Sequence, residues 1–272
     1  PLAMPTYLSA YSYADMLDQA GPFYGVWSAL FGAEAYPRIH SVGGAIGVLS
    51  LVLYPYVFLS ARAAFIQQST TLIEAARTLG LAPARCFWRV GLPLARPAVA
   101  IGVALVLMEC LNDIGAVEHL GVETLTIGVY DTWLVRGSLV GAAQLALMLL
   151  GFIALLMLVE RSQRRTGSYS AREERQRSLP RFMPSKAGAI AAFIGCLLPV
   201  LFGFILPTFA LVSDALDQSI TFELQSAATN SFMLAAIAAT LTTCLGLLLA
   251  YGARSSRIQA MRALVGFSAL GY

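Results

Sequence analysis

Five long apolar segments constrain this chain more than any other feature of its sequence. Each is long enough to cross the ~30 Å hydrocarbon core of a bilayer, which takes about 20 helical residues. Leu, Ala, Val and Ile dominate these segments without period-2 alternation, so helices are favoured over a membrane barrel. Charged residues make up only 12% of the chain, well below the ~25% that is typical of soluble domains. We therefore predict an all-α polytopic transmembrane helical bundle, with spans at approximately 42–62, 94–113, 139–159, 187–212 and 226–252 and partial spans at 1–19 and 262–272.

The distribution of Lys and Arg between the spans predicts which side of the membrane each loop faces. Short cytoplasmic loops carry an excess of these residues. Segments 62–96, 160–186 and 253–262 are rich in Arg, whereas the segments that alternate with them carry the acidic residues Asp15, Asp18, Glu34, Asp113, Glu118, Glu123, Asp131, Asp214, Asp217 and Glu223. Only Arg38 and Arg136 break this alternation. The basic segments are therefore expected on the cytoplasmic side.

The charge and cysteine patterns exclude two classes of function. The arginines lie in short loops between apolar spans and form no continuous basic face, so we expect no nucleic-acid partner. The four cysteines are far apart and include no CxxC pair, so they are expected to be small core residues without a disulfide framework. Because the chain starts at Pro1 inside an apolar segment and stops within another, we expect it to be truncated at both ends.

The basic segment 62–96 is too long for a simple turn, and its pattern predicts two short helices. An apolar face recurs at i, i+3, i+4 and i+7 through Leu72, Ala75, Ala76 and Leu79. Gly80 suits the left-handed position that closes a helix, and Pro83 suits the first turn of a second helix. We expect Leu92-Pro93 to end this second helix and Pro97 to open the next span. From the residues alone, the hairpin could equally pack only on its own protein.

The same segment contains a long gapped motif. Glu74-Ala75-Ala76, three residues, Gly80, nine residues and then Val90-Gly91-Leu92-Pro93 resembles the EAA motif of the permeases of ATP-binding cassette (ABC) importers. The family pattern has Ile where this chain has Val90, and every spacing agrees. In that family the loop docks into a groove on the cytoplasmic ATPase. The resemblance therefore implies a type I importer fold and an ATPase-coupling role for Glu74, Ala75, Ala76, Gly80, Val90, Leu92 and Pro93.

The resemblance also implies the partners of the chain. These would be a cytoplasmic ABC ATPase dimer, a periplasmic or extracellular substrate-binding protein, and the lipid bilayer of a bacterial cytoplasmic (inner) membrane. The chain has no GxxxxGK[ST] phosphate-binding loop. We therefore expect ATP and Mg to bind the partner subunit, no cofactor to bind this chain, and the chain itself to be a transport subunit and not an enzyme.

A second permease-like segment follows a polar, basic stretch. Residues 230–257 resemble the opening core helix of another permease domain. We expect 1–160 to be the C-terminal part of a first permease repeat, 161–186 a cytoplasmic linker, and 187–272 the N-terminal part of a second repeat. This tandem form, together with residues 92–126, is most similar to fused ferric-iron permeases, which implies ferric iron as the cargo. Thiamine, a polyamine or an inorganic anion are the alternatives.

Three polar residues near the outer end of one span are candidates for the translocation path. Glu109, Asn112 and Asp113 fall at i, i+3 and i+4, so we expect them to share one helix face. An ionisable group within a span is costly and is by default a functional hypothesis. The equally weighted alternative is a hydrogen-bonding cluster that pins helices together.

The residues with metal-binding chemistry do not form a convincing site. Tyr7, Tyr11 and Tyr13, with Asp15 and Asp18, are read as an aromatic belt and an acidic outer loop. His40 and His119 are isolated from each other, so no metal ligand is assigned.

Two rival classes remain open at this point. The first is an ion-driven secondary transporter with internal repeats, in which substituting Glu74 or Gly80 would leave transport intact. The second is a membrane-embedded enzyme. It would need clustered catalytic groups at membrane depth, where only Glu109 qualifies, so it ranks lower.

Overall fold

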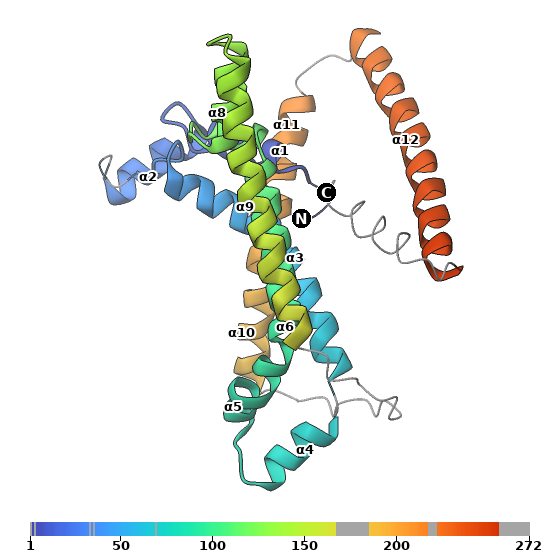
Figure 1. Ribbon diagram of the computed structural model, residues 1–272. Coiled ribbons are helices and arrows are strands. Elements are labelled where there is room, and N and C mark those ends of the chain that lie inside the picture. Colours follow the sequence, from blue (N-terminus) through green and yellow to red (C-terminus); the bar gives the residue numbers. More distant parts are fainter. Residues whose placement is uncertain are drawn as a thin grey trace. The chain divides into compact units, whose positions relative to one another are not determined.

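The structure, a computed structural model, describes residues 2, 4–32, 34, 36–68, 70–166, 185–216 and 222–255. All regular elements in these ranges are helices, which confirms the predicted fold class (Figure 1). Five helices or continuous helical stretches are long and apolar enough to cross a membrane: Val42–Gln67, Pro83–Asn112, Leu139–Leu158, Lys186–Leu216 and Leu224–Leu249. They coincide with the five predicted spans. The predicted partial span 262–272 lies outside the described residues, as do residues 167–184 of the predicted linker.

The spans belong to the long helices α3 (Val42–Gln67), α6 (Leu92–Asn112), α9 (Leu139–Thr166), α10 (Lys186–Val200) and α12 (Phe222–Ser255). The shorter helices are α1 (Thr6–Met16), α2 (Pro22–Phe31), α4 (Thr70–Thr78), α5 (Pro83–Cys86), α7 (Gly115–His119), α8 (Leu125–Leu134) and α11 (Leu206–Leu216). The chain forms two compact units, Pro1–Ser213 and Asp214–Tyr272. In the second unit, α12 is a single helix of 34 residues.

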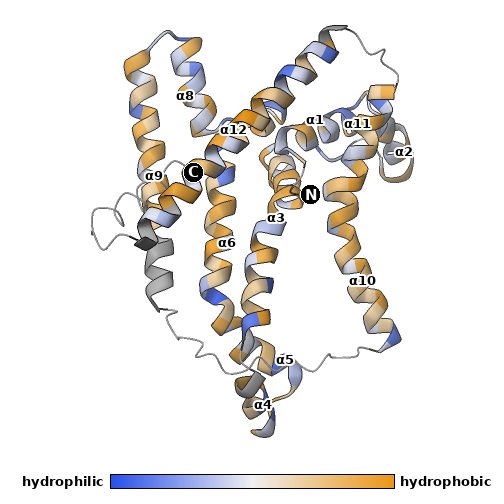
Figure 2. Ribbon diagram, turned by 90° about the vertical axis from the view of Figure 1, so that its right-hand side faces the viewer, coloured by the Kyte–Doolittle hydropathy of each residue, from blue (hydrophilic) through white to orange (hydrophobic). Residues whose placement is uncertain are grey.

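The long helices expose hydrophobic side chains around much of their circumference. On α9, Leu147, Leu150 and Leu155 are all more than half exposed, and hydrophobic residues run along α3, α6, α9 and α10 (Figure 2). A helix that is apolar on all sides is buried either in a large core or in a membrane. The described residues of the first unit leave more than half of each of these side chains uncovered, and the bilayer is the environment that accounts for this exposure.

A small core holds one end of the first unit together. It is formed where α1 and α7 pack against α3, around Ala10, Val48, Ala116 and Leu120. Ala10, Ala116 and Leu120 are fully buried. The short helices α1, α2, α7 and α8 lie at this end of α3 and α6, and α4 and α5 lie at the other end (Figure 1). Within the first unit, the basic segment 70–91 and the acidic residues of the short helices, such as Asp15, Glu118 and Asp131, therefore lie at opposite ends, as the charge pattern predicts.

Residues 201–207 pack against α1 and α3 within the first unit. A π-helical turn, η3 (Leu201–Ile205), lies against α3, and a Cβ placed on Gly203 would lie 3.1 Å from the backbone carbonyl carbon of Leu51. The Tyr13 hydroxyl donates a hydrogen bond to the Phe202 carbonyl. The Ser12 hydroxyl lies 3.4 Å from the Pro207 carbonyl. The predicted repeat boundary at 187 stays a prediction, but the first compact unit extends beyond it to Ser213.

The prediction that Leu92-Pro93 ends a helix is wrong. The helical segment continues without a break from Pro83 to Asn112, through a second π-helical turn, η2 (Phe87–Gly91). Proline has no N–H and normally breaks an α-helix at a cost of about 3 kcal/mol. In η2 the Leu92 N–H instead reaches the Phe87 carbonyl, five residues back.

The same arrangement recurs in η3. There the Leu206 N–H bonds the Leu201 carbonyl, again one residue before a proline, Pro207. We attribute both π-helical turns to these prolines. Each proline lacks an N–H, and in each turn the residue before the proline bonds the carbonyl five residues back. Pro97 likewise lies inside α6 and does not open it.

Three interpretations of single residues are also wrong. Cys196 and Cys244 are exposed and are not core residues, whereas Cys86 is buried. Tyr13 is 7% exposed, so it belongs to the core and not to an aromatic belt. Its ring faces α3 and η3, because the helix period of α1 turns it away from the surface that carries Tyr7 and Tyr11.

Candidate functional site: the helical hairpin between α3 and α6

The hairpin consists of residues 70–91, which form α4, α5 and η2. The first part of the EAA-like motif lies in α4, which ends in a Schellman turn. The Leu81 N–H bonds the Ala76 carbonyl at 3.1 Å, and the Gly80 N–H bonds the Arg77 carbonyl at 2.9 Å. Gly80 has φ +86°, the left-handed conformation that glycine adopts without strain. This confirms the predicted conformation of Gly80. The spacing between Ala76 and Gly80 is therefore set by the hydrogen bonds that close α4.

The motif residues divide into an exposed and a buried group. Glu74, Ala75 and Gly80 are exposed, and α4 lies beyond the ends of α3 and α6 (Figure 1). Ala76 is only 5% exposed and faces the rest of the hairpin. Val90, Leu92 and Pro93 are half-buried in the continuous helix that begins at Pro83. The last three lie at the base of the hairpin, so the exposed group offers the larger surface to a partner, and a coupling role for all seven residues stays a prediction.

Large apolar side chains accompany the exposed group. Leu72 and Leu79 lie on the same face of the hairpin as Ala75, and Leu79 is 84% exposed. Trp88, in η2, is also exposed. Exposed apolar patches beside polar residues are typical of protein–protein or membrane contacts. The predicted apolar face of α4 is therefore present, but Ala76 alone packs inward.

The base of the hairpin is held by contacts between α3 and η2. The side-chain amide of Gln68 donates a hydrogen bond to the Gly91 carbonyl at 2.7 Å. The rings of Phe65 and Phe87 are stacked, with centroids 5.7 Å apart. Sequence reasoning missed these residues. A lone Gln or Phe in an Arg-rich loop carries no spacing signal, and only the chain reversal brings the two ends together.

The three polar residues predicted near the outer end of α6 do not form one cluster. Glu109 faces α3, where its carboxylate accepts a hydrogen bond from the Tyr56 hydroxyl at 3.3 Å. Asn112 is exposed. Asp113 has left the helical conformation, and its carboxylate accepts the Ala116 N–H at 2.8 Å at the start of α7. The hydrogen bond between Tyr56 and Glu109 supports a role in holding α3 and α6 together. A role of the three residues in a translocation path stays a prediction.

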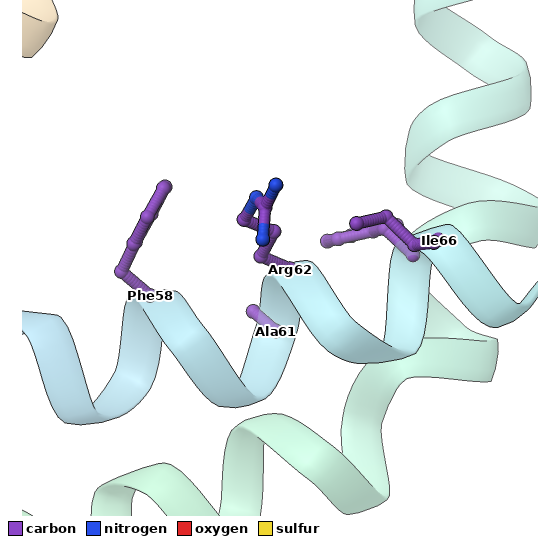
Figure 3. A pocket seen from close by; sticks show the side chains of 5 residues that line it. Phe58, Ala61, Arg62 and Ile66 are labelled. Carbon is purple, nitrogen blue, oxygen red and sulfur yellow. The ribbon is translucent and has the colours of Figure 1, made fainter.

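A surface depression runs along α3 near the hairpin. It is lined by Phe58, Ala61, Arg62, Phe65 and Ile66. The side chains of Phe58, Arg62 and Ile66 project from the same side of the helix (Figure 3). Its wall is apolar except for the Arg62 guanidinium, so it offers no set of polar groups for a small hydrophilic ligand. The hairpin is therefore the better candidate site.

Comparison with known proteins identifies several similar transport proteins. A 2-aminoethylphosphonate transport system permease protein, PhnU, of Salmonella typhimurium is 30% identical over 61% of this chain and 60% of its own length. The sulfate transport system permease protein CysT of Escherichia coli is 31% identical over 43% of this chain and 41% of its own length. An Fe(3+)-transport system permease protein, FbpB 2, of Haemophilus influenzae is 26% identical over 45% of this chain and 24% of its own length.

The chain thus spans less than two thirds of the length of the curated relatives that it matches. No solved structure matches it. Residues 8–166, more than half of the chain, match the family described as binding-protein-dependent transport system inner membrane component. The matched range includes α3, the hairpin and α6. This chain therefore belongs to the family of binding-protein-dependent transport system inner membrane components.

Proposed function

We propose that this chain is part of the membrane-spanning permease of an ATP-driven, binding-protein-dependent importer, and that α4 and its closing turn contact the ATPase. The observation that carries the proposal is the exposure of Glu74, Ala75 and Leu79 on a helix that projects beyond the spans. The family match supports the importer class. The chain is a transport subunit, and permeases of this family bind no cofactor themselves. ATP and Mg bind to the partner subunit.

The mechanism follows from the arrangement of the hairpin. A permease without a nucleotide site needs a rigid contact through which the closing of the ATPase dimer reaches the spans. The Schellman turn at Gly80 fixes the angle at which α4 leaves the hairpin. Beyond the hairpin, α3 and α6 are in extensive contact. Displacement of α4 by the ATPase would therefore move both spans and alternate the access of the pathway between the two sides.

The partners at the other end follow from charge. A loaded substrate-binding protein is expected to dock on the outer face, which carries Glu118, Glu123 and Asp131. Arg136 is one of the two basic residues that break the charge alternation. Its Nε atom lies 3.5 Å from Oδ2 of Asp131 in an exposed ion pair. Such a pair contributes at most about 1 kcal/mol, and it leaves the outer loops acidic overall.

Two cargoes are supported by different observations. The tandem arrangement predicted from the sequence and the similarity to FbpB 2 support ferric iron. The similarity to PhnU extends over more of this chain and supports 2-aminoethylphosphonate. The relative named for sulfate transport keeps an inorganic anion as a third candidate.

The test uses the full-length permease with its own ATPase and binding protein, reconstituted in liposomes. ATP hydrolysis is recorded with the binding protein empty, and then loaded with ferric ion, 2-aminoethylphosphonate, sulfate or thiamine. We expect one loaded form to raise the hydrolysis rate above that of the empty form, and the ferric and phosphonate forms are the leading candidates. Stimulation by sulfate or thiamine alone would overturn both leading cargoes.

Transport that continues without ATP but collapses with the ion gradient would overturn the importer class. It would favour the secondary transporter instead. A sodium or proton ionophore added to the same liposomes separates these two outcomes.

A further inference from the structure

We propose that Gln68, together with Phe65 and Phe87, is a clamp that fixes the coupling hairpin to the ends of α3 and α6. The inference rests on the proposed coupling function and extends it to positioning residues outside the EAA-like motif. It concerns how displacement of α4 reaches the spans, and not which partner displaces it.

The clamp closes the hairpin where it enters and leaves the bundle. Gln68 follows the last residue of α3, and its backbone is extended, with φ −65° and ψ 138°. Gly91 is the last residue of η2, immediately before α6. The hydrogen bond of 2.7 Å from the Gln68 amide to the Gly91 carbonyl therefore joins the two ends of a segment of 22 intervening positions.

Four groups converge at this point. Gly91 is buried, and a Cβ placed on it would lie 3.7 Å from Gln68 Oε1 and from Phe65 Cε1, and 3.9 Å from Phe87 Cδ2. Phe65 and Phe87 themselves stack with an interplanar angle of 24°. A stacked aromatic pair and a shielded hydrogen bond side by side stabilise one relative placement of the two helix ends.

The π-helical turn η2 makes this geometry accessible. Its widened backbone redirects the bonding of the carbonyls that precede Pro93. Gln68 uses the Gly91 carbonyl, which has two lone pairs and can accept a side-chain donor in addition to a helical N–H. The clamp thus lies next to Leu92-Pro93, the C-terminal end of the EAA-like motif in this sequence.

The mechanical role follows from what connects α4 to the bundle. Only position 69 separates Gln68 from the first residue of α4. Because the backbone of Gln68 is extended, α3 does not continue into α4 as one helix, and the two backbone torsions of Gln68 allow the direction of α4 to change. With the clamp closed, both ends of the hairpin move together, so a push on α4 shifts α3 and α6. With the clamp open, the same displacement rotates α4 and does not move α3 and α6.

The first experiment measures the rigidity of the hairpin directly. Spin labels are placed at Ala63→Cys on α3 and Arg77→Cys on α4, both exposed, in the full-length permease with its native cysteines replaced. Distance distributions are recorded by electron–electron resonance without nucleotide and with ATP plus vanadate. In the parent protein we expect a narrow distribution of equal width in both states.

Two variants open the clamp in different ways. Gln68→Leu removes the amide, and Gln68→Glu keeps the shape but replaces the donor by an acceptor. Loss of one neutral hydrogen bond shifts an equilibrium about fivefold, so we expect both variants to broaden the distribution. The matched control Gln67→Leu changes the exposed neighbouring glutamine and should leave the width unchanged. Equal widths in the parent and in a folded Gln68 variant would overturn the clamp.

A second readout separates positioning from simple stability. A residue that only stabilises the fold lowers ATP hydrolysis and transport in proportion, whereas an open clamp raises the ATP hydrolysed per molecule transported. We expect this ratio to rise in Gln68→Leu, by at most the roughly fivefold shift of the equilibrium between the open and the closed clamp. An unchanged ratio contradicts the clamp.

The outcome is distinguishable from failure of the proposed function. If the ATPase did not bind the permease, the coupling proposal would fail, while the distance widths without nucleotide would still report on the clamp. If the ATPase bound and Gln68→Leu changed neither the widths nor the ratio, the clamp alone would fail.

Discussion

Replacing Gly203 by leucine is expected to prevent η3 from packing against α3 and to destabilise the first unit severely. A Cβ at this position would collide with the carbonyl oxygen of Leu51 and lie 3.1 Å from its carbonyl carbon. Both atoms are backbone atoms within α3, so they cannot move aside as a side-chain end would. Overpacking a core typically costs about 1–3 kcal/mol, and we expect the upper end of that range or more.

If η3 no longer packed against α3, two polar contacts beside Gly203 would also break. The Tyr13 hydroxyl would lose the Phe202 carbonyl, and Ser12 would lose its longer contact to Pro207. A buried hydroxyl without a partner adds about 1–3 kcal/mol. Size-exclusion profiles of the full-length permease in detergent after a temperature series measure the effect, because the variant should aggregate at a clearly lower temperature.

Gly195→Leu is the matched control for this substitution. Gly195 lies in α10, and a Cβ built there would meet no atom of the described residues within 4 Å, apart from its chain neighbours and the backbone of its own helix. The same leucine should therefore be tolerated and give a profile like that of the parent protein. If both variants were equally stable, the packing of η3 on α3 would be contradicted.

Replacing Gly80 by valine is expected to abolish most ATP-driven transport while leaving the stability of the spans nearly unchanged. The left-handed backbone at Gly80 costs an ordinary L-residue about 1–2 kcal/mol, and a β-branched side chain is tolerated least. Apart from its chain neighbours, no atom in the described part of the chain lies within 4 Å of a Cβ at Gly80, so the effect comes from the turn and not from a clash. A cost of this size changes the population of the native turn about five- to thirtyfold.

Gly80→Asn provides the comparison, since asparagine adopts the left-handed conformation more readily than other side chains. We expect it to retain much of the transport that valine loses. The measurement is ATP-driven uptake into proteoliposomes at equal amounts of permease. Full uptake by Gly80→Val would show that transport does not need α4 at a fixed angle. That outcome is the one expected of a secondary transporter.

The sequence was sufficient for features that depend on local pattern. Apolar length predicted the five spans, and the Arg and Lys alternation predicted that the basic hairpin and the acidic short helices lie at opposite ends. Gly80 was predicted from its position after an apolar face, because a Schellman turn involves only neighbouring residues. These features need no knowledge of which helices touch.

Features that depend on tertiary contacts were missed. The continuous helix through Leu92-Pro93 was predicted to break, because proline rules assume α-helical bonding and not a π-helical turn. The burial of Tyr13 depends on η3, which lies 189 positions away in the sequence. The Gln68 to Gly91 hydrogen bond exists only after the chain reverses, and neither residue belongs to an amphipathic pattern that would have revealed it.

The candidate site was predicted in part for the same reason. The motif spacing located the hairpin, but it could not separate the exposed Glu74 and Ala75 from the buried Ala76. Spacing also placed Glu109, Asn112 and Asp113 on one face. That holds only while the helix continues, and Asp113 instead turns out of α6 and accepts the N–H of Ala116 in α7.

The most direct test of the account is site-specific photocrosslinking from the hairpin to the ATPase. A photoreactive amino acid is placed at Leu79, which is 84% exposed beside Gly80, and in a second variant at Val135, which is 74% exposed beyond the end of α8. The full-length permease is irradiated in membranes together with its ATPase and binding protein. We expect position 79 to crosslink to the ATPase and position 135 not to. Crosslinking of the ATPase from position 135, or its absence at position 79 in a complex that hydrolyses ATP in response to cargo, would contradict it.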